Sequence, residues 1–195
     1  TLSLHDALPI LLAPLLGISA SSLLLLPVHV VLLELLIDPT CSIVLERQPA
    51  ESDIMNRKPR DPREGILTSK VLVKSIIQGV VLFAASFGTY YYYLESGIEL
   101  ARSMGLAIIM ISNLLLVQVN SSNSELAYKS IIKLRKDKVM WSVAIGTIVG
   151  LAIILYTPLS GFLGLVPLGT SEILKVCGIS LVSILWYEVV KLFKK

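Results

Sequence analysis

Four long stretches of this 195-residue sequence contain few or no charged side chains, and they limit what the chain can fold into. Each runs for about 18 residues or more, which is roughly what a helix needs to cross ~30 Å of hydrocarbon. Hydrophobic residues make up 54% of the sequence and charged residues 16%. The mean hydropathy is +0.78, well above that of an ordinary soluble domain. The sequence therefore predicts a protein whose solvent is a lipid bilayer. The four stretches are 71–94, 102–119, 139–156 and 173–190.

A fifth stretch, residues 22–45, is equally long but contains Glu34, Asp38 and Pro39. Proline lacks an N–H and clashes with the carbonyl of the residue four positions earlier, so we expect the helix to kink or unwind there. A short apolar segment, 10–16, is too brief to span and is interpreted as the tail of a further helix. The predicted fold is an all-α integral membrane protein. It has five transmembrane helices plus the tail of a sixth, and the first full helix is broken at Pro39.

Basic residues are very unevenly distributed between the predicted loops. Of the 17 lysines and arginines, all except Arg102 and Lys175 fall in or beside the 46–70 loop, the 120–138 loop and the C-terminal tail. Cytoplasmic flanks of membrane helices retain positive charge. We therefore expect both loops and the C-terminus to be cytoplasmic, in a membrane that we interpret as a prokaryotic plasma membrane. The net charge of +3 then reflects topology, and no nucleic-acid partner is expected.

Glu34 and Asp38 are the main candidates for a functional site. They lie four residues apart and so share one helical face, and a carboxylate at mid-bilayer costs at least ~2.5 kcal/mol. Carboxylate oxygens and the carbonyls released by a broken helix suit a hard cation or a proton. Alternatively, both side chains bond to polar groups on neighbouring helices. Asn113 offers an amide oxygen near the middle of its span, for the cation or for an interhelical hydrogen bond. We expect His29 to form a hydrogen bond between helices and Cys41 to pack as a small apolar residue.

Two sequence segments resemble a known family. The run LLPVHVVLLELLID at 25–38 and the run ESDIMNRKPRDPRE at 51–64 are similar to the sixth membrane helix and following cytoplasmic loop of calcium-pump-like P-type cation ATPases. The resemblance extends over 11–195 and implies the sixth to tenth helices of such a pump, N-terminally truncated. It places that family's sixth-helix ion ligands at Glu34, Ile37 and Asp38, of which only Asp38 is retained. An eighth-helix ligand falls on about Asn113.

The resemblance also implies partners and cofactors. The 46–70 loop would contact the N-terminal pump domains that phosphorylate an aspartate, and those domains would use ATP and Mg²⁺. This sequence contains no D-K-T-G-T phosphorylation motif, so the 195 residues are not expected to hydrolyse ATP or to hold a cofactor themselves. The transported cation would be calcium or another hard cation. The coupling residues expected in the loop are Asp53, Met55, Arg57, Pro59 and Arg60.

We therefore divide the chain into two parts. Residues 1–10 read as the translation of DNA that resembles a sequencing adapter, and we expect no native structure from them. Residues 11–195 are interpreted as the ion-pathway membrane domain of an ATP-driven cation pump, without its ATP-hydrolysing domains. The alternative is a self-contained small ion channel or secondary transporter that works without ATP.

Overall fold

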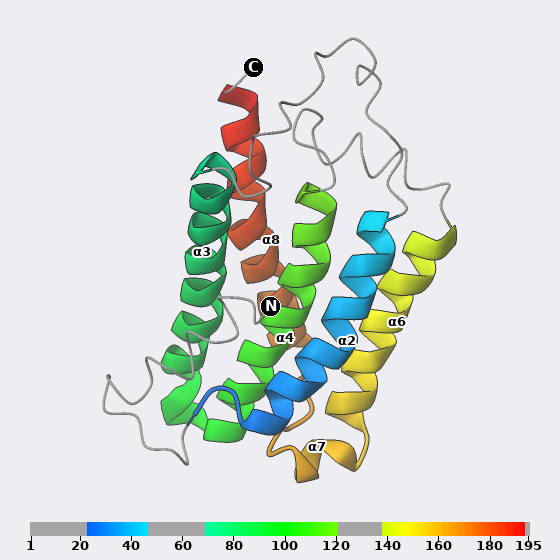
Figure 1. Ribbon diagram of the computed structural model, residues 1–195. Coiled ribbons are helices and arrows are strands. Elements are labelled where there is room, and N and C mark those ends of the chain that lie inside the picture. The colour runs from blue at the N-terminus through cyan, green and yellow to red at the C-terminus, as the bar shows by residue number, and fades with distance from the viewer. Residues whose placement is uncertain (1–22, 47–68, 121–137, 194–195) are drawn as a thin grey trace, which may run out of the picture.

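The protein is a bundle of helices (Figure 1). The computed structural model describes residues 23–46, 69–120 and 138–193. Within these residues every regular element is a helix and none is a strand, which confirms the predicted all-α class. Two short helices, η3 (Leu94–Ser96) and α7 (Leu159–Phe162), lie in connections. The long helices are α2 (Pro27–Glu46), α3 (Ser69–Tyr93), α4 (Ile98–Asn120), α6 (Lys138–Tyr156) and α8 (Thr170–Phe193).

Successive long helices run in opposite directions, so the chain passes back and forth along the bundle (Figure 1). The turn from α3 to α4 is tight and passes through Gly97, whose φ of 140° lies in a region that favours glycine. α7 and the segment leading to α8 lie at the same end as this turn, which we call the α7 end. The α2 C-terminus, both ends of the 121–137 gap and the α8 C-terminus lie at the opposite end. The alternation therefore brings the flanks of the basic loops to one end, as their charge predicts.

Three of the predicted spans have the length and composition needed to cross a membrane. They are Pro27–Val44, Val71–Ser96 and Ile98–Val117, and Trp141–Tyr156 forms a shorter apolar helix. The last of the four apolar stretches, 173–190, also lies within a helix, α8. Many large apolar side chains on these helices are exposed, including Val31, Tyr92 and Val182. Such surfaces suit lipid or further membrane helices as neighbours.

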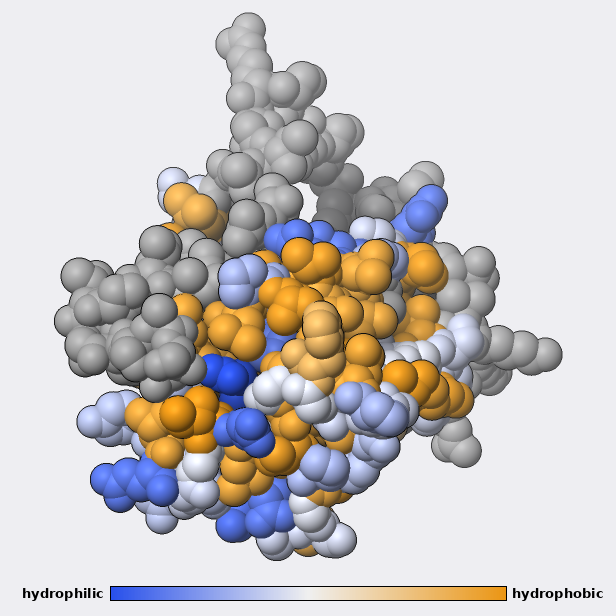
Figure 2. Space-filling model, turned by 90° about the horizontal axis from the view of Figure 1, so that it is seen from below, coloured by the Kyte–Doolittle hydropathy of each residue, from blue (hydrophilic) through white to orange (hydrophobic). Residues whose placement is uncertain are grey.

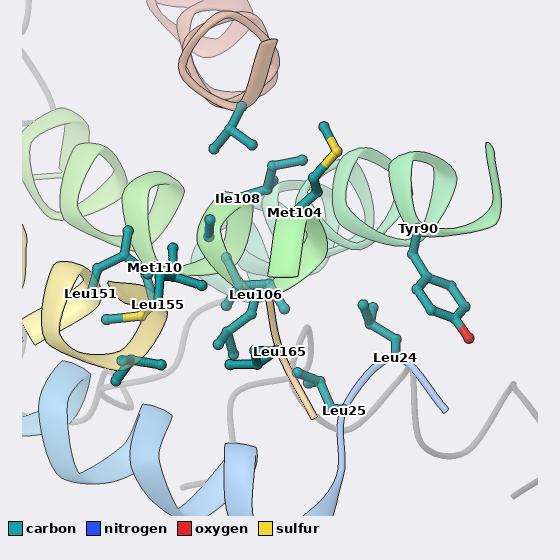
Figure 3. Close-up of a cluster of buried hydrophobic side chains, with 14 of the residues drawn as sticks. Leu24, Leu25, Tyr90, Met104, Leu106, Ile108, Met110, Leu151, Leu155 and Leu165 are labelled. Carbon is teal, nitrogen blue, oxygen red and sulfur yellow. The ribbon is translucent and has the colours of Figure 1, made fainter. Parts of the chain in front are cut away.

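α4 is the central helix of the bundle. It packs against α2, α3, α6 and α8, and every side chain from 101 to 110 is buried. Of its apolar window 67% is buried, against 18% for α2 and 22% for α3. Figure 3 shows the resulting core, in which Met104, Leu106 and Ile108 of α4 lie among side chains from the surrounding elements.

Close helix packing depends on Gly105 at the centre of α4. A Cβ atom at this position would overlap the side chain of Leu24 and would lie 3.5 Å from Ser86 Oγ. The Ser86 hydroxyl donates a hydrogen bond of 3.0 Å to the Gly105 carbonyl. The absent side chain therefore lets Leu24, which lies just before α2, pack directly against α4, as small residues do in membrane bundles.

Pro39 is where the structure differs from the sequence-based expectation. α2 is one uninterrupted helix from Pro27 to Glu46, with Pro39 inside it, and its ribbon is continuous in Figure 1. The predicted break at Pro39 is therefore not observed. A proline removes a single hydrogen bond, and helical geometry on both sides can persist when neighbouring helices hold them in place. Here α2 packs on α4 and α6, which provide that support.

Candidate cation site

Glu34 and Asp38 project from α2 beside its packed face. The inward stripe of α2 consists of Leu33, Ile37 and Val44. Each carboxylate follows one of these residues directly, so it is rotated by about 100° from the stripe. Both carboxylates are exposed, and neither forms a hydrogen bond or ion pair with the part of the chain that the structure describes.

The surface around the two carboxylates is apolar. Val31 is 64% exposed and Leu35 is 68% exposed, and both lie within one turn of Glu34. In a bilayer this face would place two ionised groups among apolar side chains, at a cost of about 2.5–3.5 kcal/mol per charge at the membrane centre. Glu34 and Asp38 therefore require a cation, a proton or polar neighbours that are not among the described residues.

Asn113 of α4, by contrast, is buried. Its side chain is 5% exposed, and Nδ2 has no hydrogen-bond acceptor among the described residues. It lines a cavity of about 10 Å³ between α2, α4 and α6, together with Cys41 and Thr147. This space is close to the lower limit for one water molecule.

The structure brings Asn113 close to α2, but against the neighbouring face. The cavity is lined by Ile37 and Cys41, which flank Asp38 in the sequence, and not by Glu34 or Asp38. The three candidate ligands therefore do not share one cavity here. Among the described residues, no three His, Cys, Asp or Glu side chains gather closely enough to hold a metal ion.

A network of hydrogen bonds holds the α7 end of the bundle together. His29 Nε2 donates to the Leu163 carbonyl at 2.8 Å, while its Nδ1 accepts from the Leu26 amide at 3.2 Å. The Ser103 hydroxyl accepts from the Val166 amide at 2.8 Å, and the Tyr156 hydroxyl donates to the Leu168 carbonyl. Side chains of α2, α4 and α6 thus satisfy the backbone of the segment between α7 and α8. His29 forms a tertiary hydrogen bond, as expected.

Arg102 was missed as a structural residue by sequence reasoning, which counted it only as a charge outside the basic loops. It is 6% exposed, and its Nε donates to the Leu23 carbonyl at 2.8 Å. Its guanidinium also lies beside Gly164. The available signal was a charged residue at the end of an apolar span, since such residues are rarely placed there without partners.

Seen from the α7 end, the surface of the protein mixes hydrophilic with hydrophobic residues (Figure 2).

Glu172 lies on the first turn of α8, at the same end. The Ser171 hydroxyl donates to its Oε1 at 2.7 Å, and this hydrogen bond lowers the pKa of the Glu172 carboxyl. The Glu172 side chain is partly exposed, and it lies on α8, apart from the candidate site on α2.

The predicted coupling residues cannot be placed. Asp53, Met55, Arg57, Pro59 and Arg60 lie outside the described residues, as do residues 1–10 and the apolar segment 10–16.

Comparisons with known proteins agree with the helical and membrane character of the chain. The family model described as "Cation transporting ATPase, C-terminus" matches residues 22–193. A curated "Calcium-transporting ATPase" of Bacillus subtilis (strain 168) is 24% identical over 159 residues. The match covers 80% of this chain and 18% of that protein, so the chain corresponds to less than a fifth of its relative.

Proposed function

The chain belongs to the cation-transporting ATPases, as their C-terminal membrane region. From this premise we propose that it forms part of the ion pathway of an ATP-driven cation pump, with Glu34 and Asp38 as cation ligands. Phosphorylation and nucleotide binding, with ATP and Mg²⁺, would belong to the rest of the pump. The basic 46–70 loop, with Asp53, Met55, Arg57, Pro59 and Arg60, would contact those domains from the cytoplasm.

The observation that carries this proposal is the pair of unpartnered carboxylates on α2. They lie one turn apart on an apolar, membrane-length helix, and the described helices leave them uncovered. A hard divalent cation takes six or more oxygen ligands at 2.0–2.6 Å, and carboxylates are the strongest of these. A bound cation would neutralise both charges and offset their cost in the bilayer.

Asn113 is proposed as a more remote contributor. Its unpartnered amide lines the cavity next to Ile37 and Cys41, so a rotation of α2 about its axis would bring Asp38 towards it. A rotation of roughly 100° separates adjacent positions on a helix, and a smaller one would suffice to place Asp38 at the cavity rim. Calcium is the first ion to test, because the Bacillus subtilis relative is described as calcium-transporting.

The test is ion-dependent phosphorylation of a complete pump that contains this region. Asp38→Asn keeps the side-chain volume but removes the charge, so we expect Ca²⁺-dependent phosphoenzyme to be lost while the protein remains folded. Glu34→Gln should shift the Ca²⁺ dependence. Glu172→Gln is the matched control, because this partly exposed carboxylate lies at the α7 end, apart from Glu34 and Asp38. Its loss should leave the Ca²⁺ dependence unchanged. Wild-type Ca²⁺ dependence in Asp38→Asn would remove Asp38 from the site.

A parallel series with Mg²⁺, Mn²⁺ and varied pH would show whether another cation or a proton takes the place of calcium.

A further inference from the structure

A continuous groove runs between α3 and α8 on the surface of the bundle. Two hollows, of about 490 Å³ and 430 Å³, both include Gly178 and Ile179 of α8 and therefore join end to end. One extends along α3 to Val81 and the other to Tyr92. The two helices pack side by side. The groove is separate from the α2 face that carries the candidate cation site.

Two sequence stripes form the walls of this groove at helical spacing. On α3 the stripe includes Val81, Ala85, Gly88 and Tyr92, and on α8 it includes Lys175, Gly178, Val182 and Trp186. The distance from Lys175 to Trp186 along α8 is about 17 Å at 1.5 Å per residue. The groove is therefore apolar and about as long as half the bilayer hydrocarbon is thick.

Glycines keep the groove open. A Cβ atom on Gly88 or Gly178 would meet nothing within 4 Å, so neither glycine is needed for the packing of the described helices. The exposed fractions of Tyr92 and Val182, at 77% and 74%, show that the rims project outwards. A ligand could therefore enter the groove from the side without displacing any helix.

The positively charged side chain of Lys175 lies at the α7 end of the groove. Lys175 Nζ donates to the Tyr93 hydroxyl at 3.0 Å and lies 5.4 Å from the centre of the same ring. An ammonium group has three donors, and Lys175 forms no ion pair with a described carboxylate. The nearby Glu172 carboxylate instead accepts from Ser171. Tyrosine side chains are enriched at the level of lipid headgroups, which is where Tyr92 and Tyr93 place this end.

We propose that the α3–α8 groove binds one anionic phospholipid, with an acyl chain along the two stripes and the phosphate at Lys175. A lipid is favoured over a partner helix because the groove combines an apolar slot of one-leaflet length with a single cation at its headgroup end. The charge complements a phosphodiester, and the slot complements a single chain. The site does not depend on which cation the pump carries.

The first experiment labels the unaltered chain in membranes. Phosphatidylglycerol with a diazirine in its acyl chain is added to membranes that contain the protein, and the crosslinked residues are mapped by peptide mass spectrometry. We expect labelling to concentrate at Ile179 and Val182 and to be reduced by unlabelled phosphatidylglycerol more than by phosphatidylcholine. Ile148 and Ile153 of α6, which are exposed but lie outside the groove, give the background. Equal labelling of both helices, or equal competition by both lipids, would overturn the proposal.

The second experiment uses variants of the same chain and native mass spectrometry. Gly178→Phe fills the groove and should reduce retained phosphatidylglycerol to background. Gly146→Phe is its matched control, because a Cβ atom on this α6 glycine also meets nothing within 4 Å. Lys175→Gln should weaken phosphatidylglycerol binding about five-fold, as expected for one basic residue near an anionic headgroup, and Lys175→Arg should restore it.

Two outcomes of this comparison would exclude the lipid site. Equal retention of phosphatidylglycerol by Gly178→Phe and Gly146→Phe would show that the groove does not hold it. The second outcome is that the wild-type protein carries a second copy of the chain or another bound protein, and that Gly178→Phe specifically loses it. This result would assign the groove to a helix partner. The labelling pattern decides the question independently if Gly178→Phe does not fold.

Discussion

At the scale of single residues, Arg102 shows how this bundle accommodates a charge in an apolar helix. Its guanidinium is buried, yet Nε satisfies the Leu23 carbonyl just before α2 begins. Arginine carries donors on three nitrogens in a fixed planar arrangement. One side chain can therefore bond to the Leu23 backbone and still reach the region of Gly164.

Replacing Arg102 should weaken the α7 end of the bundle. In Arg102→Met the Leu23 carbonyl loses its donor, so we expect the free energy of unfolding to fall by about 1–3 kcal/mol. Arg102→Lys should not restore it, because lysine has no donor at the position of Nε. The measurement is unfolding of the purified chain by SDS titration in detergent micelles. Lys175→Met, which removes an exposed cation and its hydrogen bond to Tyr93, is the control and should cost less. Equal stability of Arg102→Met and this control would contradict a structural role for Arg102.

The sequence predicted the position of a residue on its helix where helical periodicity and the cost of burying a charge determine that position. Glu34 and Asp38 stand out because carboxylates are rare in apolar spans, and the structure places both on one exposed side of α2. The position of Asn113 could not be predicted, because its orientation towards Cys41 and Thr147 depends on how α4 is rotated between α2 and α6. The backbone acceptors of His29 and Arg102 depend on loop conformations that no local pattern specifies.

At the scale of helices, close approach at Gly105 should be essential. Gly105→Leu would place a large side chain where even a Cβ atom meets Leu24 and Ser86. Overpacking of this kind costs about 1–3 kcal/mol, so we expect a matching loss in the free energy of unfolding. Gly146→Leu on α6, where a Cβ atom meets nothing within 4 Å, should change stability little. Similar effects at both glycines would show that helix propensity, and not packing, is being measured.

Pro39 gives a prediction in which stability and function change in opposite directions. α2 is continuous through the proline, but the residue still lacks an N–H, so one carbonyl in the preceding turn has no helical partner. Pro39→Ala should restore that hydrogen bond and raise the free energy of unfolding by about 1–3 kcal/mol, the cost of leaving one buried carbonyl unsatisfied. If the released carbonyl helps to bind the cation, the complete pump should also lose Ca²⁺ affinity. Increased stability with unchanged Ca²⁺ affinity would limit the site to side chains.

The sequence predicted the helices better than their details. Long apolar runs with few charges correspond to α3, α4, α6 and α8, because burial of apolar side chains in lipid leaves few alternatives to a helix. The expected break in α2 was not found, since a proline rule derived from isolated helices omits the support that α4 and α6 provide. The short helix α7 was not predicted either, because its conformation depends on hydrogen bonds from distant helices to the segment that follows it.

At the scale of the whole molecule, the path of the chain places the flanks of the basic segments at one end of the bundle, where the distribution of charge predicts them. The alternation of helices brings the C-terminus of α8 to the same end as the flanks of the 47–68 and 121–137 segments. These segments and the tail contain most of the 17 basic residues. Among the described residues, the basic side chains at the α7 end are those of Arg102, which is buried, and Lys175. Positive loops are retained in the cytoplasm, so the α7 end should face outwards.

Reporter fusions test this orientation directly. Green fluorescent protein fused after Lys195 should fluoresce, because it folds in the cytoplasm, whereas alkaline phosphatase fused after Gly97 or Gly164 should be active, because it requires export. The reverse pattern would place the basic loops outside and would separate the 46–70 loop from any cytoplasmic ATP-driven domain. Replacing the basic residues of 121–137 with glutamine should reduce the preference without inverting it, because orientation depends on the charge of several loops together. Complete inversion by that change alone would show that one loop determines the topology of the entire bundle.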